Sequence, residues 1–240
     1  MIVLFIHVIV ESIHQRPDHT MEDKTNSPWL LLTISGLAGV PSCSNGLWSR
    51  LKIPNLEWRS QGNIKAVRSP MHREVIESTL PMIMDHCQRW GDKTRLALVG
   101  HSLGAVDAVW ISCRVREMFG DKIRMLTIGV AGAFGTEKND FLYKCGVHRT
   151  IVESISINSA FMQRMQHHSQ TLPYHPKSKA VFIMTSLDDI VVPATNSLFY
   201  SFPPGHHLRH FALHGVGHGA SFMASYPITT DFITKFFCPD

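Results

Sequence analysis

One serine stands in a setting that can make it a nucleophile. Ser102 is the centre of Gly100-His101-Ser102-Leu103-Gly104, between a predicted strand at 94–99 and a predicted helix at 105–119. So tight a strand-to-helix turn strains the central residue, and glycines two positions away remove the side chains that would clash. The pattern predicts a nucleophile elbow that exposes the Ser102 hydroxyl at the carboxyl end of a sheet.

A serine hydroxyl is a weak nucleophile near neutral pH and needs a histidine base held by a carboxylate. Asp188 and Asp189 follow the strand predicted at 179–186, and both are candidates for the carboxylate. His218 lies between glycines after the strand predicted at 208–213, which makes it the predicted base. The neighbouring His214 is assigned to the end of that strand. The order serine, aspartate, histidine is the one found in proteins with such an elbow.

Strands and helices alternate along the chain, which predicts a parallel sheet covered on both faces. Pro81 should kink or split the helix expected before the elbow. Further expected elements are strands at 29–35, 63–67 and 123–130 and helices at 45–51, 70–90 and 221–237.

Length and composition fit one soluble globular domain over residues 1–240, with residues 131–178 as a candidate lid or cap insertion. The net charge of +4 is scattered, so no nucleic-acid partner is expected. Five cysteines without a Cys-x-x-Cys pair favour reduced thiols and a cytoplasmic location. The apolar run 1–10 is interpreted as a strand, with a weak signal or anchor as the alternative, and no stretch reaches the length of a membrane-spanning helix.

Two other patterns are set aside. His206, His210, His214 and His218 recur every fourth residue, but the prolines and glycines around them argue against a helical metal site. The glycines at 129, 132 and 135 lack the Gly-Lys-Ser/Thr of a phosphate loop. No metal and no cofactor is therefore predicted.

The combined motifs resemble the α/β-hydrolase superfamily, in particular its lipase and carboxylesterase branch with bacterial lipases and GPI inositol-deacylase-like proteins. The resemblance runs from Trp29 onward and rests on the elbow, on Gly217-His218 before a helix, and on Asp189-Ile-Val-Val-Pro193. In that family the catalytic aspartate lies four residues before a proline, which favours Asp189 over Asp188. The stretch 127–136 is similar to the strand and glycine-rich turn that open the lid of such lipases.

The resemblance implies an α/β-hydrolase fold, a doubly wound, mostly parallel sheet with helices on both faces and a small lid. The oxyanion hole should use the backbone amides of Leu103 and Leu37. Ser35-Gly36-Leu37-Ala38-Gly39 replaces the family's usual His-Gly, which leaves Ala38 as an alternative second donor.

The expected activity is hydrolysis of a small-molecule or lipid carboxylic ester through an acyl-enzyme on Ser102. Three related activities with the same triad are alternatives: thioesterase, acyltransferase and peptidase. A catalytically silent fold that serves as a binding module is the alternative from another class.

Overall fold

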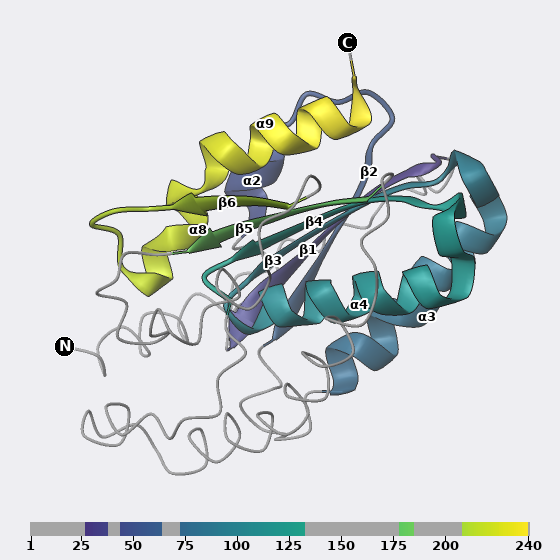
Figure 1. Cartoon of the computed structure of the whole chain (residues 1–240), viewed down its shortest axis with the longest axis horizontal. Helices are drawn as coiled ribbons and strands as arrows, with labels where there is room; N and C mark the ends of the chain where they lie inside the picture. Colours follow the sequence, from purple (N-terminus) through teal and green to yellow (C-terminus); the bar gives the residue numbers. More distant parts are fainter. Residues whose placement is uncertain (1–26, 38–43, 64–72, 133–177, 185–207, 240) are drawn as a thin grey trace, which may run out of the picture.

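A sheet of six parallel strands forms the centre of the molecule, in the order β2-β1-β3-β4-β5-β6 (Figure 1). The computed structural model describes residues 27–37, 44–63, 73–132, 178–184 and 208–239. Every neighbouring pair of strands is parallel. The strands are β1 (Trp29–Leu37), β2 (Glu57–Asn63), β3 (Arg95–His101), β4 (Arg124–Val130), β5 (Ser178–Met184) and β6 (Leu208–Ala212).

Helices cover both faces of this sheet (Figure 1). One face carries α3 (Arg73–Trp90) and α4 (Leu103–Phe119). The other carries α2 (Asn45–Trp48), α8 (Ser221–Ala224) and α9 (Tyr226–Phe237). Three single 3-10 turns complete the described elements: η4 (Gly91–Lys93), η5 (Gly120–Lys122) and η7 (His218–Ala220).

Alternation along the central strands sorts their side chains into two cores. Leu30, Leu32 and Ile34 of β1 pack with residues of α3 and α4, whereas Leu31 packs with residues of α2 and α9. Because both faces are buried, a central strand is apolar at nearly every position. This explains why β1, β3 and β4 are recognisable in the sequence as continuous apolar runs.

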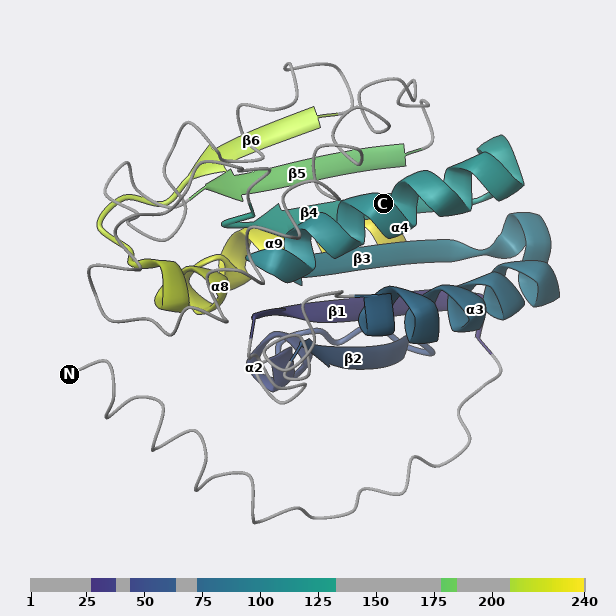
Figure 2. The same cartoon turned by 90° about the horizontal axis from the view of Figure 1, so that it is seen from below.

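The order of the strands changes direction between β1 and β3, as the view in Figure 2 shows. The chain first moves outward from β1 to β2, then returns to place β3 on the other side of β1 and continues to β6. In open α/β sheets such a switch point opens a crevice at the carboxyl ends of the strands, where ligands bind. The structure therefore directs attention to the ends of β1 and β3.

Most predicted elements that are described are confirmed, but the start of the strand predicted at 63–67 is wrong, and residues 64–67 lie outside the described residues. The strand is β2 (Glu57–Asn63), which begins six residues earlier and pairs with β1 from Leu30↔Glu57 onward. Within the described sheet, β2 is an outer strand with β1 as its partner. An outer strand needs no apolar side chains on both faces, so the polar sequence Glu-Trp-Arg-Ser-Gln-Gly-Asn did not resemble a strand.

The helices differ from expectation in three details. The helix predicted at 70–90 is described from Arg73, and Pro81 does not split it. The helix predicted at 45–51 ends at Trp48 and has Ser44 at its N-cap. The closing helix is divided into α8 and α9 at Ser225, because a proline in the first turn of α9 has no N–H to continue the preceding helix.

Several predictions fall outside the described residues. These are the strand at 1–10, residues 133–177 of the candidate lid, and the segment 185–207. Among the helices that are described, none combines the length and the hydrophobicity needed to cross a bilayer.

Candidate active site

Ser102 occupies a strained turn between β3 and α4, as the elbow pattern predicts. Its backbone has φ 54° and ψ −120°, a conformation that costs energy for any residue with a side chain. A Cβ on Gly100 would lie 2.0 Å from the Gly104 carbonyl oxygen, and one on Gly104 would lie 2.3 Å from the Ile34 oxygen. Glycine is therefore required at both positions so that α4 can leave the strand at this angle.

The structure brings Ser102 and His218 together from positions 116 residues apart. His218 Nε2 lies 2.9 Å from Ser102 Oγ, within hydrogen-bonding distance. His218 begins η7, after the loop that follows β6, while Ser102 follows β3. Parallel strands place both loops at the carboxyl end of the sheet. The pair has the geometry of a nucleophile and its general base.

The end of β1 approaches the same serine. A Cβ on Gly36 would lie 2.8 Å from Ser102 Cβ and 3.2 Å from the carbonyl oxygen of His101. The register between β1 and β2 shifts after Ile34, so that Leu37 is paired with Asn63. This irregularity turns the backbone of Gly36 and Leu37 beside the elbow.

Leu103, the second predicted oxyanion donor, is the first residue of α4. N–H groups in the first turn of a helix have no partner within the helix and carry the positive end of its dipole. The amides of Leu37 and Leu103 thus belong to the two backbone segments that flank Ser102.

Hydroxyl contacts hold the region around the end of β1. Thr33 Oγ1 donates to Ser44 Oγ at 2.8 Å, and Ser44 Oγ lies 2.6 Å from Ser60 Oγ. Thr33 belongs to β1, Ser60 to β2, and Ser44 precedes α2. These contacts hold the start of α2 against β1 and β2.

His101 makes contacts that the sequence did not predict. Its Nε2 lies 3.0 Å from the carbonyl oxygen of His218 and 3.1 Å from Ser221 Oγ. Ser221 Oγ in turn donates to the same carbonyl at 2.6 Å. The signal available in the sequence was the histidine directly before the nucleophile, whose position at the end of β3 makes contact with neighbouring loops possible.

The remaining site predictions are only partly covered. Asp188, Asp189, Ala38 and His206 lie outside the described residues. His214 is not part of a strand end, because β6 stops at Ala212 and His214 lies in an exposed turn. Within the described ranges, no group of three or more His, Cys, Asp or Glu residues is arranged to hold a metal.

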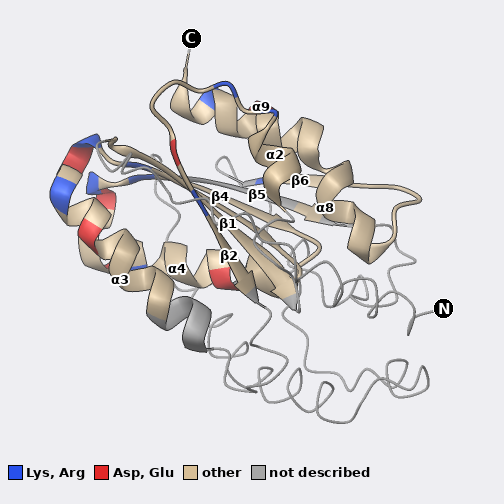
Figure 3. Ribbon diagram, turned by 180° about the vertical axis from the view of Figure 1, so that it is seen from behind, with Lys and Arg blue, Asp and Glu red and all other residues tan. Residues whose placement is uncertain are grey.

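The described segments that converge on Ser102 carry few charges. No Lys, Arg, Asp or Glu occurs at 27–37, 96–106, 125–132 or 211–230. Figure 3 shows α8 free of red and blue. Met223 of α8 is 61% exposed, although large apolar side chains are usually covered. The described backbone segments next to Ser102 are therefore mostly uncharged and apolar, with the buried Asp107 of α4 as the nearest acidic residue in the chain.

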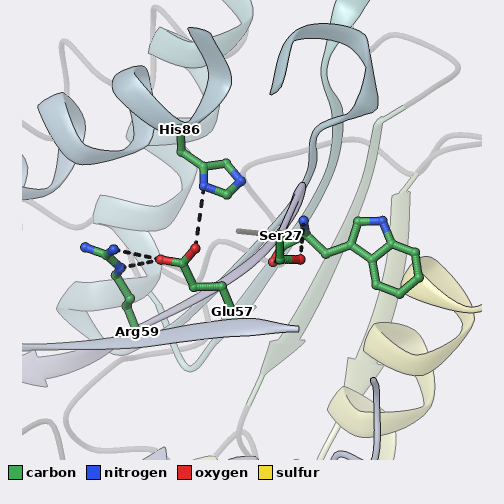
Figure 4. Close-up of polar contacts among 5 residues, drawn as sticks. Ser27, Glu57, Arg59 and His86 are labelled. Atoms are coloured by element: carbon green, nitrogen blue, oxygen red, sulfur yellow. Dashed lines mark hydrogen bonds and ion pairs between the residues drawn. The ribbon is translucent and has the colours of Figure 1, made fainter. Parts of the chain in front are cut away.

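A separate polar cluster lies at the amino end of β2 (Figure 4). Glu57 is 8% exposed and accepts from Arg59 Nε at 2.8 Å, and His86 Nδ1 lies 3.8 Å from its other oxygen. Burial lowers the pKa of His86, although the Pro28 carbonyl and Glu57 oppose this shift. Because strands β1 to β3 are parallel, this cluster lies at the opposite end of the sheet from Ser102.

Comparison with known proteins identifies similar structures, although no protein-family model and no curated protein sequence matches the chain. One of two metagenome-derived lipolytic enzymes, LipS and LipT, superposes with a TM-score of 0.61 at 15% identity, covering 87% of this chain and 94% of that one. The peroxisomal alpha-beta-hydrolase Lpx1 from Saccharomyces cerevisiae gives 0.59 at 12% identity, covering 92% and 81%.

A thioesterase is similar as well. RedJ, from the prodiginine biosynthetic pathway of Streptomyces coelicolor, gives a TM-score of 0.55 at 15% identity, covering 91% of this chain and 95% of its own. At these identities the similarity concerns the fold, which several reactions share.

Proposed function

The chain has the α/β-hydrolase fold, and on this premise we propose that it is a serine hydrolase that cleaves carboxylic esters. The observation that carries the proposal is the 2.9 Å contact between His218 Nε2 and Ser102 Oγ at the carboxyl end of the sheet. A binding module with no activity would have no need for the strained Ser102 backbone, which costs stability.

In the proposed reaction, Ser102 Oγ attacks the ester carbonyl carbon while its proton passes to His218 Nε2. The carbonyl oxygen becomes an oxyanion, stabilised by the amides of Leu37 and Leu103. When the tetrahedral intermediate collapses, the C–O bond to the alcohol breaks and His218 returns the proton to the leaving alcohol. Water then repeats these steps on the acyl-enzyme, releasing the acid and restoring the serine.

We assign Asp189 as the carboxylate that orients His218, on the basis of its place after β5 and four residues before Pro193. β5 lies between β4 and β6 in the sheet, so a loop after it would lie near the loop that carries His218. Residues 131–178 are proposed as a lid over the site. With Ser102 and His218, Asp189 completes a triad of the serine-hydrolase type, and the amides of Leu37 and Leu103 form the oxyanion hole beside it.

The uncharged segments around Ser102 and the exposed Met223 support a neutral acyl substrate. A thioester is the second candidate, because the thioesterase RedJ has a similar fold. Both reactions use the same nucleophile and base, and they differ in the leaving group.

The test is a panel of ester, thioester and amide substrates of one acyl group, with acyl chains of graded length. We expect ester turnover that falls by roughly 10³-fold or more in Ser102→Ala. Faster turnover of the thioester than of the ester would favour thioesterase activity, the second candidate. No turnover of any substrate by the folded native chain would contradict the proposal.

A further inference from the structure

We propose that His101 is a positioning residue that, together with Ser221, holds the main chain of His218 and thereby keeps the imidazole at Ser102. This inference rests on the proposed function, since it concerns how the base of that reaction is held. It adds a role for the residue directly before the nucleophile.

The loop around His218 is rich in glycine. Gly217 and Gly219 flank the histidine, and a Cβ added to either would meet no atom within 4 Å, so open space surrounds both. Gly215 has φ 68°, in the region that only glycine adopts readily. A loop rich in glycine loses much conformational freedom when it is ordered, and it needs specific contacts to stay in one place.

Hydrogen bonds to the His218 carbonyl supply these contacts. Ser221 Oγ donates to the carbonyl oxygen at 2.6 Å, and His101 Nε2 lies 3.0 Å from the same atom. A carbonyl oxygen can only accept, so His101 must carry its proton on Nε2. Because Ser221 uses its proton on the carbonyl, its oxygen remains free to accept from the same Nε2–H at 3.1 Å. The three groups form a closed triangle.

Packing keeps the His101 ring in place. Its centroid lies 5.2 Å from the His218 ring and 5.7 Å from the Phe222 ring, which is itself 7% exposed. Ser221 is fully buried. His101 is therefore bounded by a fixed aromatic ring and a fixed hydroxyl, so its imidazole can serve as a support.

His101 is the residue directly before Ser102 in the chain. One peptide bond links it to Ser102, so the end of β3 carries the nucleophile and also holds the backbone of the base. Any shift of this strand end moves both partners together, which preserves the 2.9 Å contact between Ser102 Oγ and His218 Nε2. A small misplacement of reacting groups can cost about 100-fold in rate.

Two substitutions separate the hydrogen bond from the packing. In His101→Gln the side-chain amide can place an N–H donor near the position of the imidazole Nε2, but the ring is lost. In His101→Phe a ring remains against Phe222, but the donor is lost. If the donor matters, kcat falls about 10- to 100-fold in His101→Phe with little change in KM, and His101→Gln restores most of it.

Ser221→Ala provides a second test of the triangle. We expect the double variant His101→Phe/Ser221→Ala to lose less kcat than the product of the two single losses, because both residues hold one carbonyl. Independent losses that multiply would contradict a shared role. A reversed order, with His101→Phe active and His101→Gln impaired, would show that only packing matters and would overturn the proposal.

Hydrogen–deuterium exchange gives a readout that does not require turnover. Peptides covering 213–225 should exchange faster in His101→Phe than in the native chain, with His101→Gln close to native. Equal exchange in all three chains would overturn the inference even if the native enzyme is active. Conversely, the expected exchange in a chain without activity would uphold the inference and count against the proposed function alone.

Discussion

Gly36 and Ser102 lie so close that the Cβ which Gly36 lacks would be 2.8 Å from the Cβ of Ser102. The end of β1 and the elbow after β3 meet here at the switch point of the sheet. No side chain fits between them, and the backbone after β1 is thereby brought beside the nucleophile. The proposed oxyanion donor Leu37 depends on this approach.

Gly36→Ala should lower kcat about 10-fold or more while leaving the fold intact. The added methyl group must displace either the end of β1 or Ser102 itself, and either shift misaligns the oxyanion donors with the serine. Steady-state kinetics with an ester substrate, beside a thermal unfolding curve, measures the effect.

Gly217→Ala is the matched control. Gly217 has φ −70°, which alanine adopts readily, and its Cβ would meet nothing within 4 Å. We expect kinetics close to those of the native chain. An equal fall in kcat in both variants would refute the proposal that the close contact between Gly36 and Ser102 is needed for catalysis.

The stability of the protein should decline in mild acid because of His86. Burial lowers the pKa of His86 below its ordinary value of 6.5; the Pro28 carbonyl and Glu57 oppose this shift, and Arg59 and Arg89 add to it. Below about pH 6.5 the unfolded chain therefore binds this proton more readily than the folded chain does. Above that pH, neutral His86 makes its full contribution to the free energy of unfolding. This contribution is lost as the pH falls toward the pKa that His86 has in the folded chain.

Urea unfolding at pH 7.5 and pH 5.5 tests this prediction. One proton contributes a slope of at most about 1.4 kcal/mol per pH unit to the free energy of unfolding. The free energy of unfolding should differ less between the two pH values in His86→Gln than in the native chain. The variant His214→Gln changes an exposed histidine and should show the same difference as the native chain. An unchanged difference in His86→Gln would refute the assignment.

Arg95 should stabilise the fold without affecting catalysis. Its Nη1 donates to the carbonyl oxygen of Phe237 at 2.5 Å, at the end of α9, and its guanidinium lies 5.3 Å from the centre of the Trp29 ring. A cation at the end of a helix also interacts favourably with the helix dipole. Arg95→Met should lower stability by about 1 to 2 kcal/mol with kcat unchanged, because the contact lies at the amino end of β3.

Chemical denaturation and ester kinetics on the same sample check this separation. Arg95→Lys keeps the charge but not the planar guanidinium, and should show an intermediate loss. A large fall in kcat in a stable Arg95→Met chain would contradict the placement of the site at the opposite end of the sheet.

Asp189→Asn should reduce kcat by several orders of magnitude, as expected when the carboxylate that orients a catalytic histidine is neutralised. Asp188→Asn is its neighbouring control and should retain most of the activity. Ester hydrolysis by the two purified variants distinguishes the two residues. The reverse ranking would assign the role to Asp188.

The sequence predicted those features that local rules determine. The elbow was recognisable because Gly100 and Gly104 are sterically required, and β1, β3 and β4 because a strand buried on both faces is apolar throughout. β2 was misplaced because a polar outer strand owes its position to pairing with β1. The contact of His101 with His218 was missed for a similar reason, since only the folded sheet brings these residues together.

The proposed nucleophile can be tested most directly by labelling with a fluorophosphonate probe, followed by mass spectrometry of the modified peptide. We predict that the folded native chain is labelled at Ser102, that Ser102→Ala is not labelled, and that the exposed-serine control Ser49→Ala is labelled like the native chain. A folded native chain that stays unlabelled, or labelling that persists in Ser102→Ala, would contradict the account.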